Sequence, residues 1–400
     1  MDMAKYFIVN TGSASKKYAL YQDSDRVFFV HFEKENLSAQ AGGSGIIATF
    51  NKGGESEKRT ISESEYVNAT KYMVNEMVKQ GMINGINDIS AVGLRVVAPG
   101  SYFLTNRVID AEYRKKLEEA KEWAPLHTAS IISEIDGLGA TLVGIPIVAV
   151  SDSAYHATMV EHSRYYGLPL DVSKQLDVLR FGYHGISFKS ILPKLESLSR
   201  VATEKAIVCH LGSGSSIMAF KNGKSFDTSM GFSPLEGLPM STRVGDIDAA
   251  AVIYLEKRLG LSPEEMEKYF NSQCGLLGLS GKTDDIRELL NLEAGGDERA
   301  KLALEIFSYK IKKYIGSYFA ALNGADILIF SGTIGERSPI MRSRICRDME
   351  ALGIVIDDER NNSTISADGF IHHETNSPVK IAVVTTDEMG QIAKETIANV

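Results

Sequence analysis

The stretch that decides the fold runs from Ala206 to Asp248 and reads AIVCHLGSGSSIMAFKNGKSFDTSMGFSPLEGLPMSTRVGDID. An apolar run at 207–209 meets a GSGS turn at 212–215, and a second apolar pattern follows over 217–220. That pattern ends at Asn-Gly (222–223), which between apolar runs is typical of a type I′ hairpin turn. The stretch therefore predicts strand, tight loop, strand, turn, strand.

The turn at 212–215 has the composition of an anion-binding loop. Its glycines let backbone N–H groups approach a ligand without a Cβ in the way. Consecutive N–H groups in such a turn form a nest for anions such as phosphate. An ordinary Gly/Ser hairpin loop has the same local composition, so this segment alone leaves both interpretations open.

The same pattern occurs once more, at the start of the chain. Residues 7–15 (FIVNTGSAS) align with residues 207–215 (IVCHLGSGS), and a second apolar stretch follows each. Two copies, one in each half, indicate a duplicated unit. Two such hairpins facing each other across a cleft would hold a polyphosphate from both sides.

Length and composition limit the class of protein. A chain of 400 residues is too long for one core and suggests two domains. The hydrophobic content of 44% and charged content of 24% are typical of a globular protein. A net charge of −8 without a block of clustered Lys and Arg argues against a nucleic-acid surface. Any anionic ligand must be held by a local site.

Cysteine use and the apolar segments bear on location. Cys209, Cys274 and Cys346 are far apart and lack C-x-x-C spacing, so neither a disulfide framework nor a zinc site is indicated. The first five residues lead directly into a strand-like run, and no segment approaches the ~20 apolar residues of a membrane span. We expect a cytoplasmic protein that is neither secreted nor bound to a membrane.

Beyond the two hairpins, strand and helix patterns alternate along the chain. Strands are expected within 21–62 and over 327–330 and 381–384. Helices are expected over 63–82, 110–123, 246–260 and 298–323, and from 262, 285 and 388 onward. Loops are expected over 124–127, 275–281 and 359–379.

Two charged residues lie next to buried-strand patterns. Arg95 lies within the apolar run 89–97, where an arginine is costly unless it is paired or holds an anion. Asp152 follows the run 145–150, and a carboxylate at the carboxyl end of a parallel strand can hold Mg²⁺ or accept a proton. A structural ion pair for Arg95 and a helix N-cap for Asp152 are the alternatives. The domain junction is expected at the same point.

Two further segments suggest ligand contacts. His184 lies between two glycines, so little side-chain bulk screens it, and we expect it to face a ligand rather than the core. The segment 331–336 (SGTIGE) follows a buried strand and is expected to be a strand-to-helix turn. Such turns commonly receive a nucleotide, although G-x-x-G alone is a weak signal.

A set of motifs along nearly the whole chain carries a resemblance to a known family. The motifs are Asn10-x-Gly-Ser-x-Ser15-x-Lys17, Arg95-Val-Val97, Pro125-Leu126-His127, Asp152 with Tyr155-His156, Phe181-Gly-Tyr183-His184-Gly185, His210-Leu-Gly-x-Gly214, Asp227-Thr-Ser-Met-Gly231, Pro234-Leu-Glu-Gly237, Thr242-Arg243-x-Gly-Asp246-Ile-Asp248, Gly275-Leu-Leu-Gly278, Ile334-Gly-Glu336 and Thr386-Asp-Glu388. Together they resemble the acetate kinase family of the acetate and sugar kinase/Hsp70/actin superfamily.

The resemblance implies a fold and an activity. It implies an α/β protein of two ribonuclease-H-like domains, residues 1–150 plus 386–400 and residues 151–385, with the active site in the cleft between them. It also implies a homodimer. The activity would be reversible phosphoryl transfer from ATP to acetate, giving acetyl phosphate and ADP, with Mg²⁺ or Mn²⁺ as cofactor and no nucleic-acid or membrane partner.

The resemblance also implies roles for single residues. The catalytic residues would be Arg95, Asp152, His184 and Arg243, and the metal would be positioned by Asn10 and Glu388. Acetate would contact Arg95, Val97, Leu126, Tyr183 and Pro234. The nucleotide would contact Lys17, His210, Gly212, Ser213, Gly214, Asp285, Arg287, Gly332, Ile334 and Gly335.

The chain departs from the family pattern at several positions, none of which removes a proposed catalytic group. The departures are Leu94, Ala98 and Pro99 around Arg95, then Thr128, Ser213, Ser241, Val244, Thr333 and Arg337. Several touch the phosphate and nucleoside side. A pyrophosphate-linked acetate kinase is therefore an alternative, although the retained turn at 334–336 favours a nucleotide.

Three further functions would use the same fold. A propionate or butyrate kinase is one, but Tyr183, where the family commonly has Phe, does not enlarge the methyl pocket. A non-catalytic nucleotide-binding relative is another, but it would not need the acceptor-side arginines Arg95 and Arg243. The third is a sugar kinase, whose site would be rich in neutral hydrogen-bonding groups, whereas two arginines suit a carboxylate.

Overall fold

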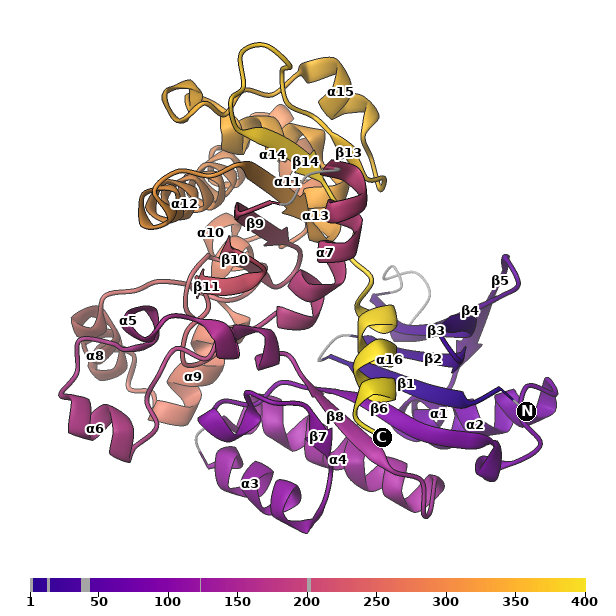
Figure 1. The fold of residues 1–400 in the computed structure, drawn as a ribbon. Helices are drawn as coiled ribbons and strands as arrows, with labels where there is room; N and C mark the ends of the chain where they lie inside the picture. Colours follow the sequence, from indigo (N-terminus) through magenta and orange to yellow (C-terminus); the bar gives the residue numbers. More distant parts are fainter. Residues whose placement is uncertain (1–2, 13–14, 37–43, 123, 200–202) are drawn as a thin grey trace. The chain divides into compact units, whose positions relative to one another are not determined.

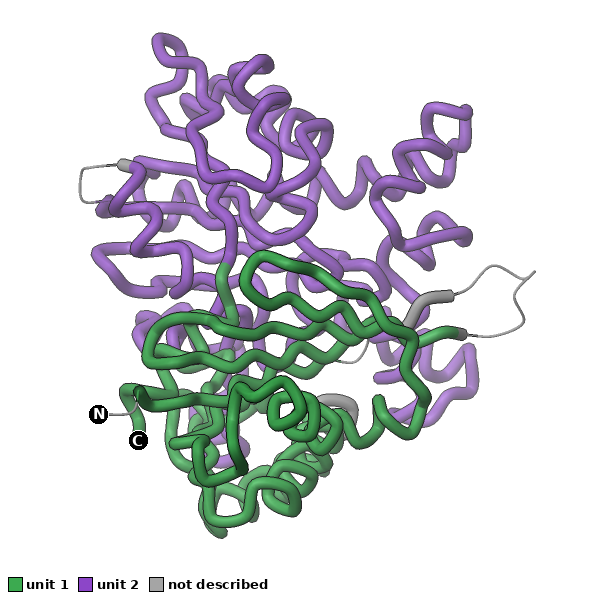
Figure 2. Tube along the Cα trace, turned by 90° about the vertical axis from the view of Figure 1, so that its right-hand side faces the viewer, with its two compact units in different colours: residues 1–154, 387–400 green, residues 155–386 purple. Residues whose placement is uncertain are grey.

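The computed structural model describes all residues except 1–2, 13–14, 37–43, 123 and 200–202 (Figure 1). The chain divides into two compact units (Figure 2). Unit 1 comprises Met1–Ala154 and Asp387–Val400, and unit 2 comprises Tyr155–Thr386. The last helix of the chain thus belongs to the same unit as the first strand.

Unit 1 is built on a mixed sheet with the strand order β5-β4-β3-β2-β1-β6-β8-β7. Strands β1 to β5 are successively antiparallel to one another, β1, β6 and β8 run parallel, and β7 is antiparallel to β8. The strands are β1 (Lys5–Thr11), β2 (Ser15–Gln22), β3 (Asp25–Asn36), β4 (Ser44–Lys52), β5 (Glu55–Ile61), β6 (Ile89–Val96), β7 (Arg107–Val108) and β8 (Ile147–Ser151). The helices are α1 (Glu63–Val67), α2 (Ala69–Lys79), α3 (Ala111–Lys121), α4 (Pro125–Thr141) and α16 (Glu388–Ala398).

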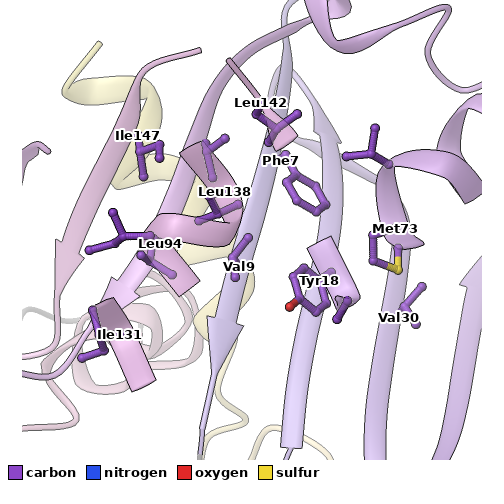
Figure 3. Packing of buried hydrophobic residues seen from close by; sticks show 14 of the residues in the cluster. Phe7, Val9, Tyr18, Val30, Met73, Leu94, Ile131, Leu138, Leu142 and Ile147 are labelled. Carbon is purple, nitrogen blue, oxygen red and sulfur yellow. The ribbon is translucent and has the colours of Figure 1, made fainter. Parts of the chain in front are cut away.

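Side chains on opposite faces of β1 pack against different helices. Phe7 and Val9 belong to the core formed with α2 and α4 (Figure 3). Ile8 points to the other face, because strand side chains alternate, and there α16 packs on β1 and β6. A Cβ on Gly93 of β6 would lie 2.0 Å from Thr396 Oγ1 of α16. Glycine at this position therefore allows the helix to approach the sheet closely.

Unit 2 repeats the central part of this plan. Its sheet has the order β11-β10-β9-β12-β14-β13, in which β9, β10 and β11 form antiparallel hairpins and β9, β12 and β14 run parallel. The strands are β9 (Lys205–Leu211), β10 (Ser215–Lys221), β11 (Lys224–Thr228), β12 (Ile327–Ser331), β13 (Gly369–Phe370) and β14 (Lys380–Val383). Asn222 and Gly223 both have positive φ, 51° and 80°, which confirms the type I′ turn.

Helices cover both faces of the second sheet. Cys209 of β9 packs in one core with the long helix α12, and Val208 packs in another with Phe188 of α7. The helices of unit 2 are α5 (Glu161–Arg164), α6 (Leu170–Gln175), α7 (Gly185–Ser199), α8 (Ala249–Leu259), α9 (Pro263–Ser272), α10 (Gly275–Ser280), α11 (Ile286–Ala294), α12 (Glu298–Leu322), α13 (Gly332–Arg337), α14 (Pro339–Cys346) and α15 (Asp358–Ser363). Short 3₁₀ turns lie at Ile86–Asp88, Ser101–Phe103, Ala154–Thr158 and Glu350–Leu352.

The fold class expected from the sequence is confirmed. Among the described residues, each unit has antiparallel strands, five in unit 1 (β5-β4-β3-β2-β1) and three in unit 2 (β11-β10-β9), followed by parallel strands, with helices on both faces. The order 3-2-1-4-5 within both sheets is that of a duplicated ribonuclease-H-like unit. Within the described residues, no helix is long and apolar enough to cross a membrane.

Two expected loops are wrong, and a third is right only in part. Residues 124–127 lead into α4, which begins with proline at Pro125, a favoured first position. The segment 275–281 forms α10 because its backbone is held by another segment, with Leu276 N–H donating to the Met240 carbonyl at 2.8 Å. The segment 359–379 contains the end of α15 and the strand β13, and its Ile371 is fully buried.

The helix expected over 63–82 is interrupted. It forms as α1 and α2, because Asn68 leaves the helical conformation (φ −96°, ψ 35°) and its side chain donates to the Ser64 carbonyl. A local side-chain bond of this kind competes with helix propagation.

Candidate functional site

Four polar residues meet at the carboxyl ends of the parallel strands of unit 1. Asn10 lies near the end of β1, Arg95 lies in β6, Asp152 follows β8, and Glu388 begins α16. Arg95 Nη2 donates to Asp152 Oδ2 at 2.9 Å, and Arg95 Nη1 donates to Asn10 Oδ1 at 3.2 Å. Asn10 Nδ2 donates to Glu388 Oε2 at 2.9 Å. The four side chains form one continuous chain of hydrogen bonds.

This chain of hydrogen bonds is buried and contains charged groups. The Asp152 side chain is 2% exposed and that of Arg95 is 17% exposed. Burial by itself lowers the pKa of Arg95, but the carboxylates of Asp152 and Glu388 outweigh it and raise that pKa above its ordinary value. Arg95 is therefore a fixed cation. Its buried Nε has no hydrogen-bond partner among the described residues, which leaves a donor for an anion.

Local backbone contacts hold the two carboxylates in place. The Asp152 N–H donates to the Val96 carbonyl at 2.9 Å, which joins the end of β8 to that of β6. Asp387 caps α16 by accepting from the Gly390 N–H at 3.0 Å. A Cβ on Gly390 would lie 2.2 Å from the Asp387 carboxylate. The cap and this glycine fix Glu388 in the first turn of the helix.

The other expected residues of unit 1 surround this cluster unequally. Lys17 of β2 pairs with Asn10 in the β1–β2 register and is partly buried. Val97 follows β6 and packs partly against the core of the unit. The backbone of Leu126 lies in the first turn of α4, and its side chain lies outside the described part of the chain.

In unit 2, two histidines lie side by side at the end of the first hairpin. The rings of His184 and His210 are 4.5 Å apart between centroids. His184 Nδ1 is 2.9 Å from Ser216 Oγ, and His210 Nδ1 is 2.8 Å from Ser187 Oγ. His184 is only 8% exposed, so the expectation of an unscreened side chain is wrong. The glycines that flank His184 could not indicate that its side chain is buried, because the groups that cover this side chain come from β10 and β9.

His184 also has an unusual backbone. Its φ is +59°, a conformation that residues with a side chain adopt rarely and that concentrates at functional sites. The preceding glycine leaves room for another histidine, because a Cβ on Gly182 would lie 2.8 Å from the His156 ring. His156 Nε2 in turn contacts the Tyr183 carbonyl at 2.9 Å. The segment that carries His184 is thus held rigidly.

Arg243 reaches the same part of unit 2. A Cβ placed on Gly214 would lie 3.2 Å from His184 Nε2 and 3.7 Å from Arg243 Nη1. The missing side chain thus leaves one space that the imidazole, the guanidinium and the glycine turn share. The Ser241 N–H donates to the Ser213 carbonyl at 3.2 Å, and Arg243 Nη1 donates to the Pro234 carbonyl at 3.4 Å. These bonds join the loop that carries Arg243 to the GSGS turn.

The expected nucleotide turn lies beside the GSGS turn. Gly332 has a φ of +73°, and a Cβ there would lie 2.7 Å from the Leu211 carbonyl oxygen. A Cβ on Gly212 would lie 3.9 Å from the Thr333 nitrogen. Gly335 packs on Phe330, while Ile334 is partly buried against the core. The two glycine-rich segments therefore approach each other closely.

Asp285 and Arg287 are not joined to this cluster. They form an ion pair with each other, 2.5 Å between Nη2 and Oδ2, and Asp285 caps α11. The Arg287 side chain is 88% exposed. No hydrogen bond among the described residues links either residue to the glycine turns.

Several polar groups of the site carried no assigned role in the sequence. Ser216 and Ser187 hold the two histidines, and Glu336 Oε1 accepts from the N–H groups of Gly332 and Thr386, both at 3.0 Å. Glu236 and Arg180 form a further ion pair in unit 2. All lie within the family motifs of the sequence analysis or a few residues from them. This proximity is the one signal in the sequence that could have pointed to them.

The oxygen donors of the unit 1 site suit Mg²⁺ better than a soft metal ion. Among the described residues, no group of three or more His, Cys, Asp or Glu side chains could hold a metal ion by itself. Unit 1 does offer two carboxylates, Asp152 and Glu388, and the amide of Asn10. Mg²⁺ is commonly bound through one or two carboxylates together with waters and substrate phosphates. These oxygen donors fit such an ion.

Comparisons with known proteins agree over almost the whole chain. The model of the acetokinase family matches residues 5–394. The acetate kinase of Bacillus cytotoxicus is 36% identical over 398 residues, covering 99% of this chain and 98% of that protein. The crystal structure of Porphyromonas gingivalis acetate kinase has 34% identity and a TM-score of 0.85, covering 99% of each chain. A propionate kinase from Francisella tularensis has 33% identity and a TM-score of 0.88, covering 100% of each chain.

Proposed function

The chain belongs to the acetokinase family, and from that premise we propose that it transfers a phosphoryl group reversibly between ATP and acetate. The products in the forward direction are acetyl phosphate and ADP. One observation carries the proposal most directly. The buried chain Asp152–Arg95–Asn10–Glu388 combines a fixed cation for an acyl carboxylate with hard oxygen donors for a metal.

Phosphoryl transfer requires positioning and positive charge more than covalent chemistry from the protein. Arg95 binds the acetate carboxylate, and Asp152 fixes the orientation of its guanidinium. Arg243 and His184 donate to the oxygens of the phosphoryl group in transfer. Asn10 and Glu388, with Asp152 nearby, would hold Mg²⁺, which supplies positive charge to the phosphates.

The remaining expected residues complete the two substrates' contacts. Val97, Leu126, Tyr183 and Pro234 line the pocket for the acetate methyl group. The turns at 212–214 and 332–335, with Lys17 and His210, lie along the phosphates, and Asp285 and Arg287 contact the nucleoside. Residues 1–150 with 386–400, and residues 151–385, act as the two catalytic domains.

A second candidate acceptor is propionate. The similarity to a propionate kinase structure over the full chain supports it. The Tyr183 hydroxyl favours the smaller acid, because it donates to the Phe232 carbonyl at 2.7 Å and so restrains the pocket. Acetate is therefore the first choice and propionate the second.

The proposal extends to assembly and location. Exposed apolar side chains on unit 2 support a homodimer, with Ile253 and Tyr254 of α8 exposed by 53% and 61%. Leu170 and Leu176, at the two ends of α6, are similarly exposed. All three cysteines are free thiols, which suits a reducing cytoplasm. Light scattering of the purified protein tests the dimer.

The first experiment traps the product. The purified protein is incubated with Mg²⁺, hydroxylamine and acetate, with ATP or pyrophosphate as the only donor in parallel, and acetyl phosphate is detected as its hydroxamate. Product with ATP alone supports the proposal. Product with pyrophosphate alone keeps the acceptor site and overturns the nucleotide contacts. If neither donor gives product with acetate, propionate or butyrate, the catalytic proposal fails and a binding protein becomes the better interpretation.

A further inference from the structure

A polar network lies under the loop 231–236 of unit 2, and none of its side chains has an assigned role. Arg180 Nη2 donates to Glu236 Oε1 at 2.6 Å. The Tyr166 hydroxyl donates to the other oxygen of the same carboxylate. The Arg180 guanidinium also lies 5.4 Å from the centre of the Tyr166 ring. Glu236 is thus held from two sides.

The loop is shaped around this network. A Cβ on Gly231 would lie 1.5 Å from Glu236 Oε2 and 2.1 Å from the Tyr166 hydroxyl. Glycine at the end of the Asp-Thr-Ser-Met-Gly motif is therefore explained by the carboxylate and phenol that occupy the space beside it. The motif and the Pro-Leu-Glu-Gly motif that follows are two parts of one packed structure.

The network reaches the acyl side through a single peptide. The Phe232 N–H donates to the Tyr166 hydroxyl at 2.8 Å, and the Phe232 carbonyl accepts from the Tyr183 hydroxyl at 2.7 Å. Both polar groups of Phe232 are therefore bonded to tyrosines. One of these tyrosines belongs to the network, and the other lines the proposed methyl pocket.

The same loop is bonded to the segments that carry His184 and Arg243. The N–H groups of Phe181 and Gly182 lie 3.1 and 3.3 Å from the Gly231 carbonyl. At the other end of the loop, the Pro234 carbonyl accepts from Arg243 Nη1 at 3.4 Å. A shift of the loop would therefore displace a pocket wall and both phosphoryl-binding groups together.

We propose that Arg180, Glu236 and Tyr166 are positioning residues that hold the loop 231–236 and thereby set the acetate pocket and the place of Arg243. This inference rests on the proposed function, since it concerns the same acceptor site. None of the three touches substrate. They act through the Phe232 peptide and the Pro234 carbonyl.

The proposal predicts a specific kinetic change. If the loop loosens, acetate binding and the alignment of Arg243 suffer, while the GSGS turn and the ATP contacts at 332–335 keep their own bonds. Tyr166→Phe removes the hydroxyl that joins Glu236 to Phe232. We expect the KM for acetate to rise on the order of tenfold and kcat to fall, with the KM for ATP unchanged, since small misplacements carry such costs.

A matched variant separates positioning from loss of a buried bond. Tyr18 of unit 1 also donates its hydroxyl to a buried carboxylate, Glu134 Oε1, at 2.9 Å, and it has no bond to the loop. Tyr18→Phe should leave both KM values unchanged. If Tyr166→Phe also leaves the acetate KM unchanged, or if Tyr18→Phe raises it equally, the positioning role is overturned.

Conservative replacement of the arginine gives an independent test. Arg180→Lys keeps a charge beside Glu236, whereas Arg180→Met keeps only the stem. The lysine variant should recover most of the acetate KM that the methionine variant loses. Equal effects of the two substitutions would contradict a role for the ion pair.

Failure of the proposed function is distinguishable from failure of this inference. An inactive wild-type protein overturns the function, and the acceptor role with it. Hydrogen exchange of the Phe232 amide needs no activity, and Tyr166→Phe should accelerate it while Tyr18→Phe should not. Active wild type with unchanged exchange in Tyr166→Phe overturns the inference alone.

Discussion

The two units have the same scaffold but place different chemistry at the same positions. Asn10, near the end of β1, occupies the place that His210 occupies in β9. Following the parallel registers outward, Arg95 of β6 corresponds to Ser331 of β12. Where unit 1 has a chain of charged and amide groups, unit 2 has histidines bonded to serines.

The difference follows from what each half would bind. Asp152, after β8, corresponds in register to Thr386 after β14, so unit 1 has a buried ion pair where unit 2 has neutral groups and a glycine turn. Fixed charges suit a small carboxylate and a metal ion, whereas backbone N–H groups suit phosphates along a flexible chain. Arg243 is the cation that the unit 2 loop adds to this neutral surface.

The largest effect is expected at Arg243. Arg243→Ala removes that cation, and by analogy with arginine fingers the turnover should fall by roughly 10³-fold or more. Steady-state kcat with ATP and acetate measures it, and Arg26→Ala, at an exposed position of β3, serves as the control. A fall in kcat of less than about tenfold, compared with the arginine-finger effect, would mean that the neutral groups of unit 2 work without an added positive charge.

A second test compares the stability of the two half-sites. Arg95→Met leaves the buried Asp152 carboxylate without its counter-charge and should lower the free energy of unfolding by about 3 kcal/mol. His210→Gln, at the place in unit 2 that Asn10 occupies in unit 1, loses one hydrogen bond with Ser187, which should cost about 1 kcal/mol. Urea unfolding of both variants measures the difference. Equal losses would show that the contrast in charge has no energetic consequence.

How much of this contrast could be predicted depends on the range of the interactions. Arg95 and Asp152 were recognisable because a charge inside an apolar strand is costly wherever the strand packs. The hairpins were recognisable because their turns need the local chemistry of Gly and Asn. The burial of His184 was not, because Ser216 and His210 reach it from strands distant in sequence.

The missed elements have the same cause. Helix α10 is short and glycine-rich, and bonds to the loop around Met240 hold it where local propensity would not. Arg180 and Glu236 are 56 residues apart, so neither predicts its partner. The sequence predicted groups whose energetic cost depends on their own segment of the chain. It missed groups whose hydrogen-bond or ion-pair partner is distant in sequence and is brought close by the tertiary fold.

A third prediction concerns a carboxyl group that is largely buried in unit 2. Burial raises the pKa of Asp227 to about 6, and Arg180 opposes that change only in part. Between its ordinary value of 3.8 and about 6, the folded protein binds more protons than the unfolded chain, so stability falls as pH rises through this window. The total fall should be roughly 2–3 kcal/mol.

Asp227→Asn removes the titration while keeping an oxygen for the Thr228 N–H, which the carboxylate accepts at 2.7 Å. Between pH 4 and pH 6, the free energy of unfolding of the variant should not show the decrease expected for the wild type. Above pH 6 the variant should be the more stable protein. Urea titrations at several pH values measure both curves. Parallel curves for the two proteins would contradict the buried position of the carboxyl group.

The smallest effect is expected at Tyr183. Tyr183→Phe keeps the ring and removes the bond to the Phe232 carbonyl, a contribution of about 1 kcal/mol. Because the same loop still has its bond to Tyr166, the pocket should widen only slightly, and the ratio of kcat/KM for acetate to that for propionate should fall less than about tenfold. Competition between the two acids in the hydroxamate assay measures this ratio. An unchanged ratio would assign the acyl preference to Val97 and Pro234 instead, whereas a larger fall would make the single hydroxyl the main determinant of acceptor size.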